Sequence, residues 1–163
     1  MEFKVKDDHF RITTDRVICK IKKEGCLVDI MDKSGTVILA DEKGFHWEPN
    51  DKYGGEIVQM SKYLQGREYF YGLGDKSGRN NMRKHKYSLW GTDSYGYGQD
   101  TDPLYKNIPF HYGVHSGIGY GVFFDNSFRS HFDFGKERDN VTSFWADGGE
   151  MNYYFIYLSL IHI

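Results

Sequence analysis

"NIPFHYGVHSGIGYGVFFDNSFRSHFDFG", residues 107–135, predicts consecutive β-strands rather than helices. Polar and apolar residues alternate along its segments "NIPFHYGV", "GYGVFFDN" and "FRSHFDFG", which is the period of a strand with one buried face. The Asp125-Asn126 pair after the second segment favours a β-turn. We therefore expect this stretch to form short strands joined by turns.

The same alternation recurs along most of the chain, and no window of helical length has a 3.6-residue apolar period. Aromatic residues make up 17 %, and 19 Gly with only 3 Pro is a composition typical of strands and turns. The early segments expected as strands are residues 3–6, 9–13, 16–21, 26–31 and 36–40. The sequence therefore predicts an all-β fold, an antiparallel β-sandwich.

Length and charge exclude several classes of protein. The 163 residues suffice for one domain but not for a (β/α)₈ barrel, which needs about 250. The net charge of −2 gives no reason to expect nucleic acid or an anionic membrane as a partner. No apolar run reaches the length of a membrane span, and the start "MEFKVKDDHF" lacks an apolar signal region, so we expect a cytoplasmic protein.

No cofactor is expected either. The glycines of "YGLG" lack the third glycine of a dinucleotide-binding fingerprint, and no βαβ pattern surrounds them. The histidines show neither zinc-ligand spacing nor the order of a catalytic triad. We expect no metal and no organic cofactor.

The two cysteines lie in "RVICKIKKEGCLVDI", which predicts a hairpin turning at Glu24-Gly25. With that turn, Cys19 pairs with Ile30, and both Cys19 and Cys26 lie on the apolar face. Two steps along the strands separate the thiols by more than a disulfide can span. The sequence predicts two reduced, buried cysteines.

The segment "SLWGTDSYGYGQDTDPLY", residues 88–105, combines carboxylates, aromatic rings and glycines. An EF-hand-like calcium loop beginning at Asp93 needs oxygen ligands at its third and fifth positions and Glu at its twelfth. The chain has tyrosines at the first two of these positions and Leu104 at the third, so this form of metal site is rejected.

A sugar-binding loop fits the same segment better. A carboxylate accepts hydrogen bonds from adjacent sugar hydroxyls, and an aromatic face covers the C–H face of the ring. Trp90, Asp93 and Tyr95 supply these groups together, whereas Asp100 and Asp102 are predicted as turn residues before proline. The basic segment "SGRNNMRKHK" before it is predicted to be a solvated hairpin loop.

Four ordered blocks, "FYGLGDKSG", "LWGTDSYGYGQDTDPLYKNIPF", "YGVFFDNSFRSHFDFG" and "FWADGGEMNYYFIY", resemble the N-terminal β-sandwich domain of glycoside hydrolase family 31. The resemblance to this α-glucosidase and α-xylosidase family, bacterial members above all, runs from about residue 3 to 157. It implies a galactose-mutarotase-like sandwich, residues 1–157, followed in the family by a catalytic (β/α)₈ barrel. The family's nucleophile and acid/base carboxylates belong to that barrel, so the chain alone is expected to be inactive.

The resemblance also assigns site residues. The family's "TD" aspartate binds sugar hydroxyls from a loop over the barrel mouth, and the matching residue is Asp93, with Ser94 and Tyr95 bordering the next subsite. The implied partners are an α-linked glucoside or oligosaccharide and the barrel itself. Asp75 departs from the pattern, which usually has Glu there, and residues 158–163, "LSLIHI", are expected to be a non-native tail.

Two other functions stay open. A free-standing, lectin-like carbohydrate-binding module would bind sugar without a barrel. A mutarotase-like epimerase would need a general acid and base in one cleft, and the sequence marks no such pair.

Overall fold

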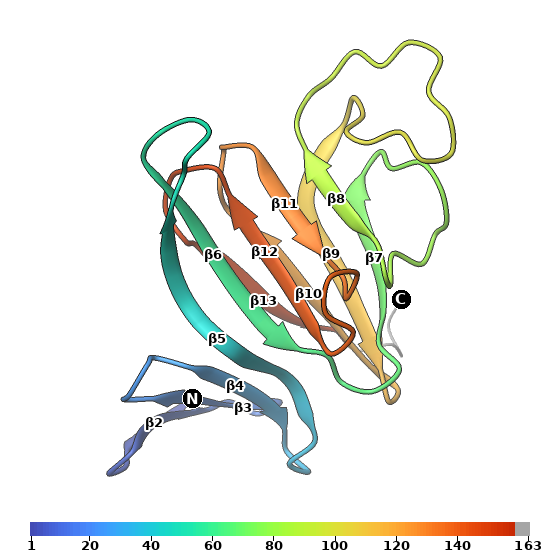
Figure 1. Cartoon of the computed structure of the whole chain (residues 1–163). Helices are drawn as coiled ribbons and strands as arrows, with labels where there is room; N and C mark the ends of the chain where they lie inside the picture. The colour runs from blue at the N-terminus through green and yellow to red at the C-terminus, as the bar shows by residue number, and fades with distance from the viewer. Residues whose placement is uncertain (159–163) are drawn as a thin grey trace.

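The computed structural model describes residues 1–158, which form two antiparallel sheets and contain no helix (Figure 1). The larger sheet has the order β1-β2-β3-β4-β5-β6-β12-β11-β8, and the smaller β13-β10-β9-β7. The strands are β1 Glu2–Val5, β2 His9–Thr13, β3 Val17–Lys22, β4 Val28–Asp32, β5 Val37–Pro49, β6 Glu56–Tyr63, β7 Tyr69–Gly74, β8 Lys86–Leu89, β9 Asn107–His115, β10 Ile118–Phe124, β11 Ser130–Asp133, β12 Val141–Ala146 and β13 Tyr153–Leu158. The predicted all-β, antiparallel fold is confirmed.

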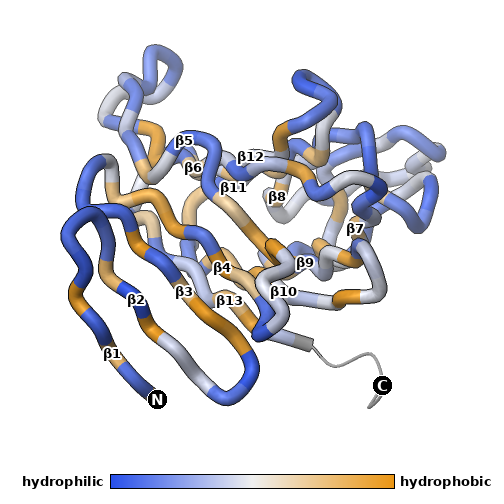
Figure 2. Tube along the Cα trace, turned by 90° about the horizontal axis from the view of Figure 1, so that it is seen from below, coloured by the Kyte–Doolittle hydropathy of each residue, from blue (hydrophilic) through white to orange (hydrophobic). Residues whose placement is uncertain are grey.

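The core lies between the two sheets and is built largely from aromatic rings. Phe70, Phe124, Phe132 and Phe134 are fully buried, and the rings of Phe70 and Phe134 stack with centroids 4.5 Å apart. Seen from below, the strands alternate between apolar and polar residues, whereas the loops beside β7 and β8 are mostly polar (Figure 2). Alternation of period two thus places one face of each strand in the core.

The stretch 107–135 contributes strands to both sheets. β9 and β10 form a hairpin in the smaller sheet, and the chain then crosses to β11 in the larger one. The hairpin depends on Gly113, because a Cβ there would lie 2.1 Å from the ring of Tyr120. The Tyr120 hydroxyl donates a hydrogen bond to the buried carboxylate of Glu68 at 2.5 Å.

The N-terminal strands β1 to β4 extend the larger sheet beyond the sandwich (Figure 1). The predicted pairing of Cys19 with Ile30 is confirmed, and both cysteines are free. The prediction that both thiols are buried is wrong: Cys19 is partly buried, but Cys26 is exposed. Cys26 belongs to the turn, with φ of +50°, because β4 begins only at Val28.

The segment "SGRNNMRKHK" is largely exposed, as predicted, but the prediction that it closes a hairpin is wrong. It connects β7 of the smaller sheet with β8 of the larger one, so its flanking strands are not neighbours. Met82 is 4 % exposed and its backbone N–H donates to the Phe70 carbonyl at 2.9 Å. The Asn81 side chain accepts from the Phe70 N–H at 3.3 Å, which fixes this crossover against β7.

Among residues 1–158 there is no helix long and apolar enough to cross a membrane. Of the predicted non-native tail, Leu158 pairs through its backbone with Gly119 of β10, and residues 159–163 lie outside the described residues.

Candidate functional site

The predicted sugar-binding residues lie in the irregular loop 90–106 between β8 and β9, which extends beyond one end of the sheets (Figure 1). Asp93 is exposed, Ser94 is partly buried, and Tyr95 is fully exposed at 100 %. The structure therefore presents Asp93 and Tyr95 to solvent from an extended loop.

An ion pair fixes the base of this loop. The Lys76 ammonium lies 2.8 Å from the carboxylate of Asp102 and donates to the Ser88 carbonyl at 2.6 Å, and its side chain is only 3 % exposed. The other Asp102 oxygen accepts from the Ser88 N–H at 2.5 Å. Asp102 is thus more than the predicted turn residue: it joins the loop to β8 and to the crossover after β7.

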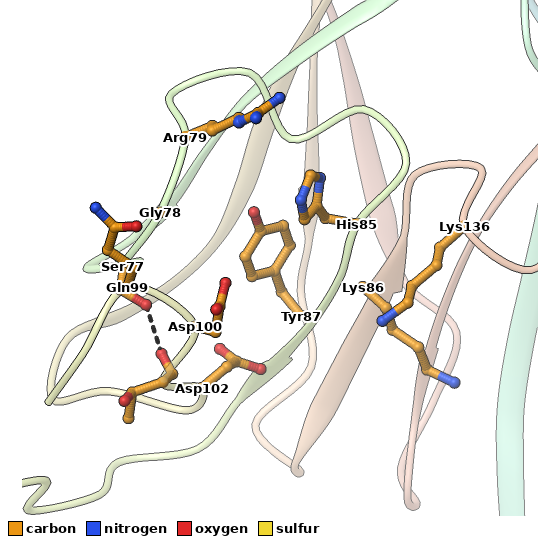
Figure 3. A pocket seen from close by; sticks show the side chains of 11 residues that line it. Ser77, Gly78, Arg79, His85, Lys86, Tyr87, Gln99, Asp100, Asp102 and Lys136 are labelled. Atoms are coloured by element: carbon orange, nitrogen blue, oxygen red, sulfur yellow. Dashed lines mark hydrogen bonds between the residues drawn. The ribbon is translucent and has the colours of Figure 1, made fainter.

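The loop also encloses a polar pocket of about 640 Å³ against that crossover (Figure 3). The Ser77 hydroxyl donates to the Thr101 carbonyl at 2.8 Å, which closes one side of it. Around the ring of Tyr87, Asp100 and Asp102 lie on one side, with lysines on the other. Burial, then the charges of Asp102 and Asp100, raises the pKa of Tyr87. The pocket is lined by Ser77, Gly78, Arg79, His85, Lys86, Tyr87, Gln99, Asp100, Thr101, Asp102 and Lys136.

Hydrogen bonds across the loop hold the segment that carries Asp93. The Ser94 hydroxyl donates to the Pro103 carbonyl at 3.2 Å, and the Tyr105 hydroxyl donates to the Ser94 carbonyl at 2.7 Å. Desolvation, then the charge of Asp93, raises the pKa of Tyr105. Ser94 is therefore tied across the loop to Pro103 and Tyr105, while the Tyr95 side chain is free in solvent.

A series of hydrogen-bonded polar side chains connects β8, β11 and the turn after β12. With the His131 ring donating from Nε2 to Asp147 at 3.2 Å, its Nδ1 accepts from the Ser88 hydroxyl at 3.0 Å. Burial lowers the pKa of His131, which favours the neutral ring that this arrangement requires. Sequence spacing gave no sign of this serine, histidine and aspartate series, because strand pairing brings Ser88 opposite His131.

Residues 1–158 contain no group of three or more His, Cys, Asp or Glu side chains arranged to hold a metal ion. Lys76 is another residue that the sequence does not mark. It lies in "FYGLGDKSG", and its partner Asp102 is 26 positions away, so only the fold shows the pair.

The chain resembles known carbohydrate-active proteins along most of its length. It is 31 % identical over 150 residues to "Alpha-glucosidase 2" of Bacillus thermoamyloliquefaciens, an alignment that covers 91 % of this chain and 18 % of that protein. It is 28 % identical to "Isomaltosyltransferase" of Sporosarcina globispora over 90 % of this chain and 14 % of that protein. This chain thus spans less than a fifth of either relative.

The fold of the chain is also similar to that of solved structures. The dextranase of Flavobacterium johnsoniae, solved as a variant complexed with isomaltotriose, superposes with a TM-score of 0.85 and 35 % identity, over 96 % of this chain and 18 % of that one. Residues 1–133 match the family described as the glycosyl hydrolase 31 N-terminal galactose mutarotase-like domain. The chain belongs to this family of glycosyl hydrolase 31 N-terminal domains.

Proposed function

We propose that this chain is the N-terminal accessory domain, residues 1–157, of an α-glucosidase-like glycoside hydrolase. Its loop 90–106 supplies substrate-binding groups to the active site of a catalytic (β/α)₈ barrel, which is its partner. The observation that carries the proposal is the exposed Asp93 carboxylate, presented beyond the sheets by a loop whose base is fixed by the Lys76–Asp102 ion pair.

The proposed substrate is an α-linked glucoside or oligosaccharide. Support comes from relatives named as α-glucosidase, isomaltosyltransferase and α-xylosidase, and from the related dextranase structure with isomaltotriose. A carboxylate such as Asp93 accepts charge-assisted hydrogen bonds from two neighbouring sugar hydroxyls. Tyr95 offers an aromatic face and Ser94 a hydroxyl beside it, bordering the neighbouring subsite.

The catalytic carboxylates of the retaining mechanism would come from the barrel. The 163-residue chain is therefore expected to leave a nitrophenyl α-glucoside unhydrolysed. Turnover by the purified chain that exceeds the turnover of a mock purification without the chain would contradict the proposal.

The role of Asp93 is tested in an enzyme in which this domain is joined to its barrel. Asp93→Ala should lower kcat/KM at least about tenfold, since a hydrogen bond to a charged group is worth about 1.5–3 kcal/mol. Asp100→Ala is the matched control, because Asp100 is an exposed carboxylate of the same loop. Equal kinetics for wild type and Asp93→Ala would remove Asp93 from the site.

The alternative is a lectin-like module that binds sugar without a barrel. Calorimetry with maltose and isomaltose, run on the wild-type chain and on Asp93→Ala, separates the two functions. The accessory-domain proposal needs no binding through the isolated loop, whereas the alternative needs at least millimolar affinity that Asp93→Ala abolishes.

A further inference from the structure

A second hollow, of about 530 Å³, lies where four connections between strands meet. Three half-exposed aromatic side chains surround it: Tyr53 at 58 %, Trp90 at 52 % and Phe128 at 53 %. Tyr53 comes from the β5–β6 turn, Trp90 from the end of β8 and Phe128 from the connection before β11. Such exposed rings around one hollow are typical of a binding site rather than of scattered surface residues.

The polar floor of this hollow is held rigidly by hydrogen bonds. The Asp147 backbone accepts from the Asn50 side chain at 2.9 Å and donates to the Arg129 carbonyl at 2.9 Å. Its carboxylate accepts from His131 at 3.2 Å through one oxygen and is 17 % exposed. The second carboxylate oxygen of Asp147 makes no hydrogen bond to residues 1–158, so it can accept one from a ligand.

Arg129 supplies the complementary donor. Its Nε is buried and has no hydrogen-bond partner among the described residues. The Arg129 and Tyr53 side chains both line the hollow. The hollow therefore contains one fixed acceptor, Asp147, and one cationic donor, Arg129.

This combination selects a class of ligand. Asp147 and Arg129 carry opposite charges, so the hollow has no net preference for an anion or a cation, and a neutral polyol can satisfy both with its hydroxyl groups. Aromatic rings around the same space cover the C–H faces of a pyranose ring. We propose that the hollow bounded by Tyr53, Trp90, Phe128, Arg129 and Asp147 is a binding site for a neutral saccharide.

The proposed site differs in its residues from the loop site. Asp93, Ser94 and Tyr95 do not line the hollow, and Trp90, three positions before Asp93, is its contribution from the loop. Saccharide binding here needs no barrel, so it can be tested on this chain alone. The inference stands or falls independently of the role proposed for Asp93.

Fluorine NMR on protein labelled with 5-fluorotryptophan gives a site-resolved test on the unmutated chain. The chain has three tryptophans, Trp47, Trp90 and Trp145, and hence three signals. Added isomaltose or maltose should shift the Trp90 signal saturably at millimolar concentrations, while the Trp47 signal stays fixed. Trp47 is the matched reference because it is 56 % exposed and lies on β5 outside the hollow. A Trp90 signal unmoved by both sugars would overturn the proposal.

Substitutions of single residues show which side chains bind the saccharide. Tyr53→Ala and Trp90→Ala should each weaken the binding at least about twofold, since each removes an aromatic face from the hollow. Trp47→Ala should bind as the wild type does. If Asp93→Ala abolishes binding while Tyr53→Ala retains it, the sugar binds the loop and the hollow is not a saccharide site.

Discussion

Replacing Asp102 by Ala tests whether the ion pair at the base of the loop organises this end of the domain. The substitution leaves the Lys76 ammonium, 3 % exposed, without its counter-charge at 2.8 Å. It also removes the acceptor of the Ser88 N–H. Both losses leave polar groups without partners, so Asp102→Ala is expected to lower the free energy of unfolding far more than a surface substitution does.

The magnitude follows from the burial of the pair. Removing one partner of a buried ion pair costs about 3–5 kcal/mol. The Asp102 side chain is 21 % exposed, so water reaches the vacated position and the lower end applies, about 3 kcal/mol. For a chain of this size that corresponds to a fall in Tm of about 6–12 °C.

Urea denaturation followed by tryptophan fluorescence measures the free energy of unfolding, with Asp100→Ala as the control. A Lys76→Met, Asp102→Ala double variant should be less destabilised than the sum of the two single variants, because neither charge is then left unpaired. Limited proteolysis should cleave loop 90–106 faster in Asp102→Ala. A loss below about 1 kcal/mol, within the range of exposed ion pairs, would refute the reasoning.

Three further predictions concern the frame of the sandwich. Burial lowers the pKa of His111 to about 3, so the free energy of unfolding should fall as pH drops from about 6.5 toward 3, by up to about 1.4 kcal/mol per pH unit. His111→Leu should flatten that part of the pH profile, which urea denaturation measures. Thiol labelling without denaturant should modify Cys26 rapidly and Cys19 slowly, and equal rates would contradict the assigned exposures. Gly113→Ala should cost at least about 1–3 kcal/mol by overpacking against a tyrosine ring, whereas Gly91→Ala, with nothing within 4 Å, should unfold like the wild type.

Strand type and local pairing were predictable from the sequence because both depend on neighbouring residues. Alternation of period two identifies the buried face, and the "KKEG" turn fixes the pairing of Cys19 with Ile30. The same pattern does not reveal how many residues a turn uses. Four residues turn here, Lys23 to Cys26, which removes Cys26 from the strand and exposes its thiol.

Sheet membership and long-range polar contacts were not predictable in this way. The alternation of polar and apolar residues is the same in either sheet. The sequence therefore predicts a hairpin where the structure has the crossover from β7 to β8. Lys76 and Asp102 contact each other directly, and both also bond the backbone of Ser88 on β8. Ser88 lies opposite His131 through the pairing of β8 with β11. Asp93 lies in an exposed loop, as Asp100 does, and its substrate-binding role rests on the resemblance and stays a proposal.

The ties within loop 90–106 decide which of its side chains can contribute most to binding. Ser94 is tied to Pro103 and Tyr105 by two hydrogen bonds, so the backbone next to Asp93 is restrained before a ligand binds. Tyr95 is fully exposed, and immobilising such a side chain costs about 0.5–1.5 kcal/mol on binding. That cost offsets much of what an aromatic contact contributes. Within an active site shared with a barrel, Asp93 should therefore dominate the loop's contribution to affinity, and Tyr95→Ala should lower kcat/KM less than Asp93→Ala does.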